Sequence, residues 1–483
     1  MGHDLRHGRD SAFRTAAGLV ALALLTSGCA FLMPDKIHYV ANPSEQPMAR
    51  CLVEDQSVPT DRILGIALSG GGSRAAVFGA ATLEALAEHG VLGQVSHISS
   101  VSGGSLAASY FLTHPPACEE APANGAEQEC WREYFTEFKA QMRINYQAGM
   151  MLRNARPTRF TSPTRRAKSF QEILDKQFLH SKTFGELESS PMVLINATSY
   201  DETRRFVFSN VCLPELDGDS ASQPSAQIEK RYQVMAREAL AAPALRAKTF
   251  SRPECTRPVP GELPLSLAVA ASAAFPPAIG PVAMEVPSGC DGGEPEWWHL
   301  GDGGVVENAG TDSLDEVLFR RLAAEGPPLE QALILSVDSG VRPDPEQLKR
   351  MDNFRMNSNP TLVNLVVITP RVRGQAYHDI FWDEMSSELA KEGIGFEKIT
   401  FRHSRAELSK LPDSCARKTS DERSMRDRLL EIPTLLMIDE CNADLLEAAA
   451  HHLVHASFDD EAVHRLTSKG FSVHNGRECA LAY

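Results

Sequence analysis

The hydrophobic pattern becomes regular at residue 62 and then repeats the order strand, glycine turn, helix. A short apolar run at 62–68 precedes a glycine cluster and apolar positions at helical spacing over 73–89. The order recurs with an apolar run at 97–101 and a helical stretch over 103–112. Short buried runs predict strands of a parallel sheet, and the helical stretches predict crossover connections. Further strand patterns occur at 192–198, 205–209, 332–337 and 362–368. The chain is therefore expected to have an α/β fold, one sheet with crossover helices on both faces.

The same pattern divides the chain into segments. We expect a main domain over 61–340, with a largely helical insertion at about 113–190. Beyond it the chain turns polar and helix-rich, and 341–483 is predicted to be a flank or a cap of that domain. Residues 29–60 read as an extended linker.

The N-terminus has the three parts of an export signal. Arg6, Arg9 and Arg14 precede an apolar run at 16–25, which is too short to span a bilayer. Small residues then lead to Cys29, as in a bacterial lipoprotein signal, although Thr26 stands where an aliphatic residue is usual. We predict that 1–28 is removed and that Cys29 is lipidated, which would anchor the protein in the cell envelope, at the outer membrane facing the periplasm or the surface. Plain secretion, with Cys29 in the discarded peptide, is the alternative.

Composition restricts the partners. The 483 residues are 43% hydrophobic, enough for a sizeable core, and the formal net charge of −15 argues against nucleic acid. No Cys-x-x-Cys or His-Glu-x-x-His pattern occurs, so we expect no metal and no cofactor. Cys118 and Cys130 flank a polar loop and could form a local disulfide. Residues 141–170 are rich in arginine, which fits either a solvated face or contact with anionic lipid headgroups.

Ser102 is the candidate nucleophile. It follows the predicted strand at 97–101 and precedes Gly103 and Gly104, so it lies in a strand-to-helix turn with small neighbours. Such a turn lifts a serine hydroxyl above the sheet. Ser100 stands where a first glycine is usual, and the motif by itself fits an ordinary structural turn equally well.

A second glycine-rich turn favours a catalytic role for Ser102 over a structural one. Gly70, Gly71 and Gly72 lie between a strand and a helix N-terminus, where bare N–H groups and the helix dipole suit an oxyanion. A dinucleotide fingerprint is the nearest rival, but it requires an acidic residue after the second strand, and none occurs between Glu88 and Glu119.

Asp302 is the candidate base. It lies in a Gly-Asp-Gly-Gly turn between two apolar stretches, whereas the similar turn at Asp291 has polar flanks and reads as a surface turn. A serine needs a base within hydrogen-bond reach to become nucleophilic. His299, three residues before Asp302, leaves a Ser-His-Asp triad as an alternative.

Together these motifs resemble the patatin-like phospholipase family. The ordered set is Gly-Gly-Gly-x-Arg at 70–74, x-x-Ser-Gly-Gly at 100–104 and Asp-Gly-Gly at 302–304, and the likeness covers roughly residues 60–310. The resemblance implies a Ser102–Asp302 dyad, an oxyanion hole made by Gly70, Gly71 and Gly72, and a supporting role for Arg74. It implies hydrolysis of phospholipid or lysophospholipid esters. Acyl transfer by the same residues, or a surface lipoprotein that binds lipid or a partner without catalysis, stays open, as does the oligomeric state.

Overall fold

The computed structural model describes residues 61–473 apart from several gaps. These gaps are 117–125, 157–158, 160–161, 189, 212–229, 244, 251–262, 277–278, 287–295, 325–328, 341–368 and 419–423. The predictions for 1–28, Cys29, the linker 29–60, Cys118 and the strand at 362–368 lie outside the described residues.

The described residues form one eight-stranded mixed sheet with the order β5-β6-β3-β2-β1-β7-β8, and β4 pairs with β3. Neighbours from β3 through β2, β1 and β7 to β8 run parallel, whereas β4, β5 and β6 form antiparallel pairs. The strands are β1 (Arg62–Leu68), β2 (His97–Val101), β3 (Met192–Ser199), β4 (Arg204–Ser209), β5 (Val282–Val286), β6 (Glu296–Asp302), β7 (Gln331–Asp338) and β8 (Gly395–Arg402).

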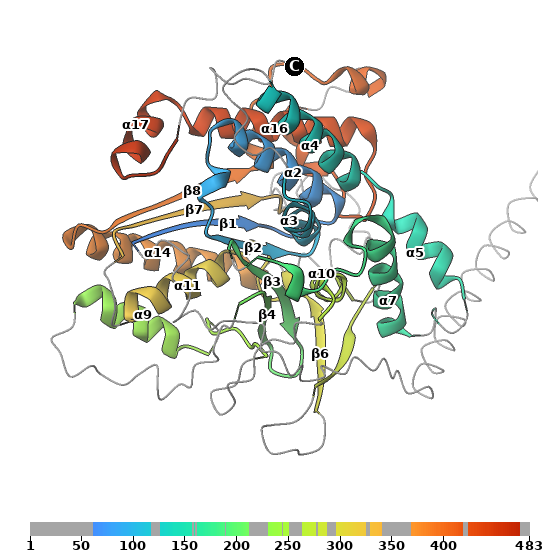
Figure 1. Ribbon diagram of the computed structural model, residues 1–483, viewed down its shortest axis with the longest axis horizontal. Coiled ribbons are helices and arrows are strands. Elements are labelled where there is room, and N and C mark those ends of the chain that lie inside the picture. The colour runs from blue at the N-terminus through green and yellow to red at the C-terminus, as the bar shows by residue number, and fades with distance from the viewer. Residues whose placement is uncertain are drawn as a thin grey trace, which may run out of the picture.

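Helices cover both faces of the sheet, and alternate residues of β1 belong to two separate cores. Leu64, Ile66 and Leu68 join one hydrophobic cluster, whereas Ile63 and Ala67 join the other. The first cluster packs under α2 (Ser73–Glu88), α3 (Gly103–Thr113), α4 (Ala126–Met142), α5 (Tyr146–Asn154), α7 (Pro163–Leu174), α10 (Leu265–Ser272), α15 (Met425–Glu431), α16 (Glu440–Ser457) and α17 (Asp460–Ser468). The second packs under α9 (Arg231–Ala241), α11 (Thr311–Ala323) and α14 (Thr369–Lys391), which lie below the sheet in Figure 1. The predicted α/β fold is confirmed.

The C-terminal region is part of the same folded unit. β8 extends the sheet next to β7, and α16 lies along α2 at the top of Figure 1. The sequence pattern did not predict β8, because most of its side chains are only half-buried and the apolar signal is weak. A disulfide joins Cys415 to Cys441 within this region. Cys130 is also disulfide-bonded, and its pairing with Cys118 stays a prediction.

None of the helices in the described part of the chain combines the length and apolar character that crossing a bilayer requires.

Candidate active site

Ser102 occupies a strained turn between β2 and α3. Its backbone has φ 49° and ψ −115°, a conformation that L-residues rarely adopt, and its side chain is buried. Strain of this kind persists only where the surroundings enforce it, and it is concentrated at functional sites. The turn therefore has the geometry of a nucleophile elbow.

The glycines after Ser102 are required by close backbone packing. A Cβ atom at Gly103 would lie 2.0 Å from the carbonyl oxygen of Gly72, and one at Gly104 would lie 2.4 Å from that of Leu68. The start of α3 thus lies directly against the chain between β1 and α2. This contact brings the serine turn and the glycine loop together.

A chain of buried hydroxyls holds the serine turn in place. The Ser102 N–H donates to Ser272 Oγ (2.8 Å), and the Ser272 hydroxyl donates to the Asn196 carbonyl (2.6 Å). Ser105 Oγ lies 3.1 Å from both Ser272 Oγ and Ser100 Oγ. Ser100, which replaces the usual glycine, therefore has a partner for its hydroxyl and introduces no unsatisfied polar group.

The glycine loop corrects one part of the sequence prediction. The Gly70 N–H donates to the Asn308 carbonyl at 2.8 Å, so it is not available to a substrate oxygen. The N–H of Ser73 is likewise used, by the Leu435 carbonyl at 2.7 Å. The remaining N–H groups of the loop are those of Gly71 and Gly72, whose φ angles of 153° and 61° favour glycine. The candidate oxyanion hole narrows to these two residues.

Arg74 is buried behind the glycine loop and ties it to two distant segments. Its Nε donates to the Ser339 carbonyl (2.9 Å) and its guanidinium also donates to the Ile432 carbonyl (2.6 Å). Ser339 Oγ in turn donates to the Gly70 carbonyl (3.1 Å). Burial lowers the pKa of Arg74 to about 10, while the charge of Asp338 opposes that shift. These contacts support the expected bracing role.

Asp302 ends β6 as a buried carboxylate. Its Oδ1 accepts from the Gly304 N–H (2.7 Å), and its carbonyl accepts from the Thr198 hydroxyl (2.8 Å). Tyr200 lies nearby: burial and the charge of Asp302 raise the pKa of this phenol to about 12. Asp302 is therefore oriented by its surroundings, and the sequence pattern did not reveal Tyr200 as one of its neighbours.

The register of β3 brings Asp302 next to the serine turn. Because β4 fills one edge of β3, β2 and β6 must share the other edge. Val101, the last residue of β2, pairs with Asn196, and Asp302 pairs with the next residue, Ala197. The two strands run toward each other and end at neighbouring positions, so Asp302 and Val101, the residue before Ser102, lie one step apart along β3.

Asn308 connects the glycine loop to the turn after Asp302. A Cβ atom at Gly70 would lie 2.5 Å from Asn308 Oδ1, and one at Gly304 would lie 2.6 Å from the same atom. The Asn308 Nδ2 group donates to the Gly70 carbonyl (3.3 Å). The sequence pattern assigned no role to Asn308.

His299 does not fit the triad alternative. It lies an odd number of residues from Asp302 on β6, so the two side chains point to opposite faces of the strand. His299 is exposed and pairs with the Asp201 carboxylate at 2.8 Å. The structure thus separates this imidazole from the buried carboxylate.

The arginine-rich stretch at 141–170 is largely engaged within the protein. Arg143 pairs with Asp444 and Glu447, and both Arg153 and Arg159 pair with Glu172. These internal ion pairs weaken the case for headgroup binding by this stretch.

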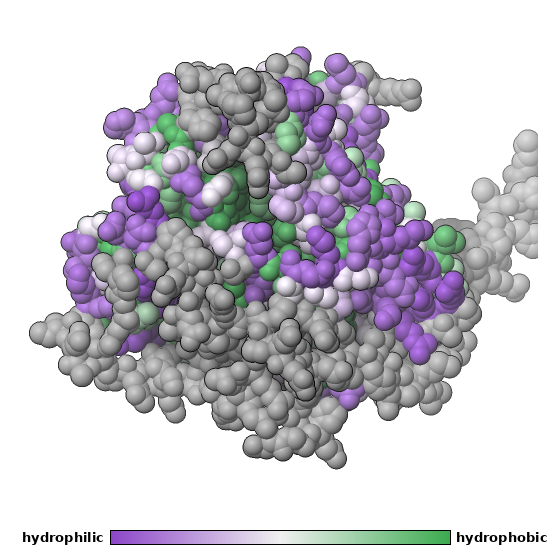
Figure 2. Space-filling view, in the orientation of Figure 1, coloured by the Kyte–Doolittle hydropathy of each residue, from purple (hydrophilic) through white to green (hydrophobic). Residues whose placement is uncertain are grey.

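Two apolar side chains of the same stretch do face solvent. Met151 and Leu152 on α5 are 63% and 79% exposed, whereas Tyr146 and Met150 are buried. Figure 2 shows a small hydrophobic area among hydrophilic surface where α5 lies. The Gln147 N–H donates to the Leu436 carbonyl, next to the residue that contacts the glycine loop. This apolar corner therefore neighbours the candidate site.

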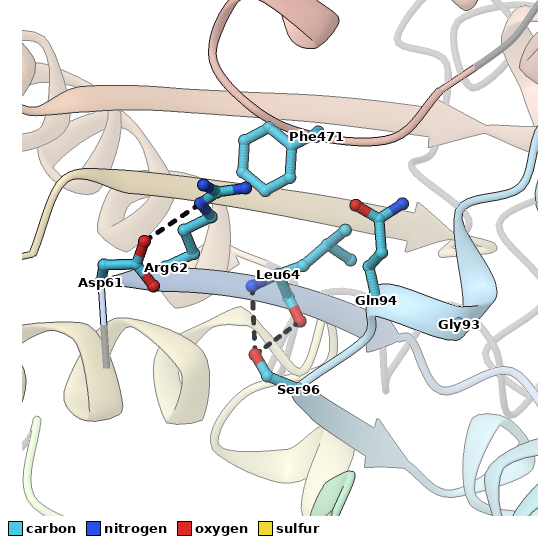
Figure 3. A pocket seen from close by; sticks show the side chains of 7 residues that line it. All are labelled: Asp61, Arg62, Leu64, Gly93, Gln94, Ser96 and Phe471. Carbon is cyan, nitrogen blue, oxygen red and sulfur yellow. Dashed lines mark hydrogen bonds and ion pairs between the residues drawn. The ribbon is translucent and has the colours of Figure 1, made fainter. Parts of the chain in front are cut away.

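A cavity of about 390 Å³ lies at the other end of β1 (Figure 3). Its lining residues are Asp61, Arg62, Leu64, Gly93, Gln94, Ser96 and Phe471. Arg62 begins β1, whereas the glycine loop follows its last residue, Leu68. The cavity is thus separate from the residues predicted for chemistry.

Comparison with known proteins places the chain in a family. The family model of the patatin-like phospholipases matches residues 66–315, and no curated protein matches. Solved structures with a similar fold include human GIVD cytosolic phospholipase A2 (13% identity, TM-score 0.39) and the same protein with a methyl gamma-linolenyl fluorophosphonate inhibitor and terbium chloride (14%, 0.42). In both cases 86% of this chain is covered, and the chain spans 60% of the human protein's length.

VipD from Legionella pneumophila is also similar (11% identity, TM-score 0.24, covering 85% of this chain and 74% of that one). At these scores the structural likenesses carry no further argument. The family match does, because it covers more than half of the 483 residues and includes all three motifs. The chain belongs to the patatin-like phospholipase family.

Proposed function

We propose that the protein is a serine acyl hydrolase that cleaves phospholipid or lysophospholipid esters with a Ser102–Asp302 dyad. The observation that carries the proposal is the strained backbone of Ser102, packed against a glycine loop and next to a buried carboxylate. A strained serine, bare loop amides and a positioned base are the three parts that acyl transfer requires.

In the first half of the proposed reaction, Ser102 Oγ attacks the ester carbonyl carbon and Asp302 accepts the hydroxyl proton. The carbonyl oxygen becomes an oxyanion, which the N–H groups of Gly71 and Gly72 stabilise at the N-terminus of α2. The intermediate collapses by breaking the bond to the alcohol oxygen. Asp302 returns the proton to that oxygen, and the acyl group stays on Ser102.

In the second half, water attacks the acyl-Ser102 carbonyl and Asp302 accepts one of its protons. The same two amides stabilise the second oxyanion. Its collapse releases the fatty acid and returns the proton to Ser102 Oγ. One carboxylate thus acts as base and then acid in each half, without a histidine.

Lipid substrates would reach the site from a membrane surface. The apolar corner formed by Met151 and Leu152 supports such an approach, since large exposed apolar side chains favour an interface. Lipidation of Cys29 would keep the enzyme at the cell envelope. Incorporation of labelled fatty acid into the wild-type chain, and its loss in Cys29→Ser, tests the anchor independently of activity.

A fluorophosphonate probe tests the nucleophile. We expect the wild-type protein to be labelled and Ser102→Ala not to be. Ser109→Ala is a matched control, because the Ser109 hydroxyl donates only to carbonyls of its own helix in α3. Equal labelling of wild type and Ser102→Ala would end the assignment. Analysis of the lipid products formed by purified wild-type protein and by Ser102→Ala then identifies the ester that is cleaved. The same analysis separates hydrolysis from acyl transfer to another acceptor.

A further inference from the structure

A cluster of histidine and glutamate side chains lies between α2 and α16, away from the candidate active site. Glu88 at the end of α2 and His451 and His455 on α16 offer one ligand atom each, all within 4.8 Å of one another. Glu88 and His451 are buried, and His455 is partly exposed. We propose that these three residues bind a divalent transition-metal ion of the zinc type.

The distances suit a metal of that class. Glu88 Oε2 lies 3.2 Å from His455 Nε2 and 3.7 Å from His451 Nδ1. Ligand atoms about 2.0–2.1 Å from a tetrahedral ion are themselves about 3.3–3.4 Å apart. The two distances from Glu88 Oε2 thus differ from this value by only a few tenths of an ångström, and the two histidine nitrogens lie within 4.8 Å of each other. Two imidazoles and one carboxylate form a ligand set typical of zinc with one open position.

The second ring nitrogen of each histidine, the one that would not bind the metal, already has a hydrogen-bond partner. His451 Nε2 lies 3.1 Å from Glu84 Oε2, and His455 Nδ1 lies 3.0 Å from His89 Nε2. Ligand histidines almost always donate their second N–H to a carboxylate, a backbone carbonyl or water, which fixes the tautomer and the ring orientation. Glu84 is such a partner for His451, and the ring nitrogen of His89 can accept from His455 in the same way. This arrangement directs His451 Nδ1 and His455 Nε2 toward Glu88.

The carboxylates around the cluster carry more negative charge than Lys139 compensates. Glu84 and Glu88 carry two negative charges, and Lys139 on α4 pairs with Glu84 at 2.7 Å. The Oε1 atom of Glu88 is buried and has no hydrogen-bond partner among the described residues. A buried carboxylate oxygen without a partner is costly, and a metal ion bound by both Glu88 oxygens would satisfy it.

A proton is the competing occupant. Burial lowers the pKa of His451, but hydrogen bonds and charges from Glu84 and Glu88 outweigh burial and raise it to about 9. An imidazolium between two carboxylates would balance the same charges. A metal differs from a proton in a measurable way, because it requires His455 as a ligand and binds with a defined stoichiometry.

The site would tie the C-terminal region to the main domain. α2 has 16 residues, so its N-terminal glycine loop and the cluster at its C-terminal end lie about 24 Å apart. The ion would thus take no part in the acyl chemistry. Its expected effect is on stability, because an ion that binds only the folded chain shifts the unfolding equilibrium. This inference would also overturn the expectation of no metal, which rested on the absence of Cys-x-x-Cys and His-Glu-x-x-His. His451 and His455 are instead spaced as His-x-x-x-His, which places two imidazoles on one helix face.

Zinc titration of the purified full chain after chelator treatment tests the proposal. We expect one Zn²⁺ per chain with a dissociation constant in the micromolar range or below, and a higher midpoint of thermal unfolding with Zn²⁺. Glu88→Gln and His455→Gln should each weaken binding at least tenfold and remove the thermal shift. His452→Gln is the matched control, since it lies on the same helix outside the ligand group.

Cobalt provides a readout that does not depend on stability. Co²⁺ bound at this site should give the visible absorption of a four- or five-coordinate ion in the wild-type chain and in His452→Gln, but not in His455→Gln. No binding tighter than about 100 μM by the wild-type chain, or equal affinities in wild type and both ligand variants, would overturn the proposal and leave the protonated His451 as the occupant.

Discussion

The two ends of β1 and β2 differ in how their polar groups are used. At the amino end, the 390 Å³ cavity is lined by groups that have partners. The Ser96 hydroxyl is hydrogen-bonded to the N–H and the carbonyl of Leu64, and Arg62 forms an ion pair with Asp61. At the carboxyl end, Ser102 has a strained backbone, and the loop amides of Gly71 and Gly72 are the ones not used by neighbouring carbonyls.

The cavity and the residues predicted for chemistry therefore lie at opposite ends of these strands. At the amino end, polar groups that line the cavity are paired with one another. The carboxyl end has enforced strain, backbone packed too closely for any side chain, and a buried carboxylate. Ligands of open α/β sheets usually bind at the carboxyl ends of the strands, and the residues predicted for chemistry lie at that end of β1 and β2. Four substitutions test whether the difference is functional.

The largest effect is expected from Asp302→Asn. Removing the base should lower kcat/KM for an ester substrate by about 10⁴-fold or more, because nucleophile and base act as a unit. Asp201→Asn is the matched control, since the Asp201 carboxylate contacts the backbone N–H and the ring of the exposed His299 rather than the serine turn. Retention of more than a tenth of the wild-type activity in Asp302→Asn would contradict the dyad.

A methyl group at Gly103 should have the next largest effect. Its Cβ atom would lie 2.0 Å from the Gly72 carbonyl oxygen, so the serine turn and the glycine loop must separate. We expect Gly103→Ala to lose at least about 100-fold in kcat, in line with a misplaced reacting group. Gly93 lines the cavity, and a Cβ atom added there would have no other atom within 4 Å. Gly93→Ala should therefore keep the activity and stability of the wild type. Similar kinetics for the two variants would erase the distinction between the two ends.

Ser272→Ala should have an intermediate effect. It removes the acceptor of the Ser102 N–H, and an unpaired buried donor costs about 1–3 kcal/mol. Each 1.4 kcal/mol corresponds to about tenfold, so kcat should fall by about tenfold while KM changes little. Ser272→Thr, which keeps a hydroxyl, should recover part of this loss. An unchanged kcat in Ser272→Ala would show that the turn does not depend on this bond.

The smallest effect on activity is expected from Ser96→Ala in the wall of the cavity. The variant loses hydrogen bonds to Leu64 and to His97 Nδ1 (2.7 Å), at a cost of about 1–2 kcal/mol in the free energy of unfolding. Urea unfolding should show the loss, and kcat/KM should not change. A fall in activity larger than that of Ser272→Ala would place function at the amino end instead.

Local structure near the candidate site was predictable from the sequence. β1, β2, α2 and α3 have nearly the predicted bounds, because buried parallel strands and glycine turns leave strong local patterns. The same patterns singled out Ser102, the glycine loop and Asp302. Patterns of this kind report which conformation a short segment prefers.

Only the tertiary structure decided which groups meet. The register of β3 places the ends of β2 and β6 end to end along one edge. The Asn308 carbonyl accepts from the Gly70 N–H, and α16 brings His451 and His455 to Glu88. Each of these contacts joins segments far apart in the chain. Their partners are chosen by how whole elements pack and by which buried polar groups must be satisfied, and neither is encoded in a local pattern of residues.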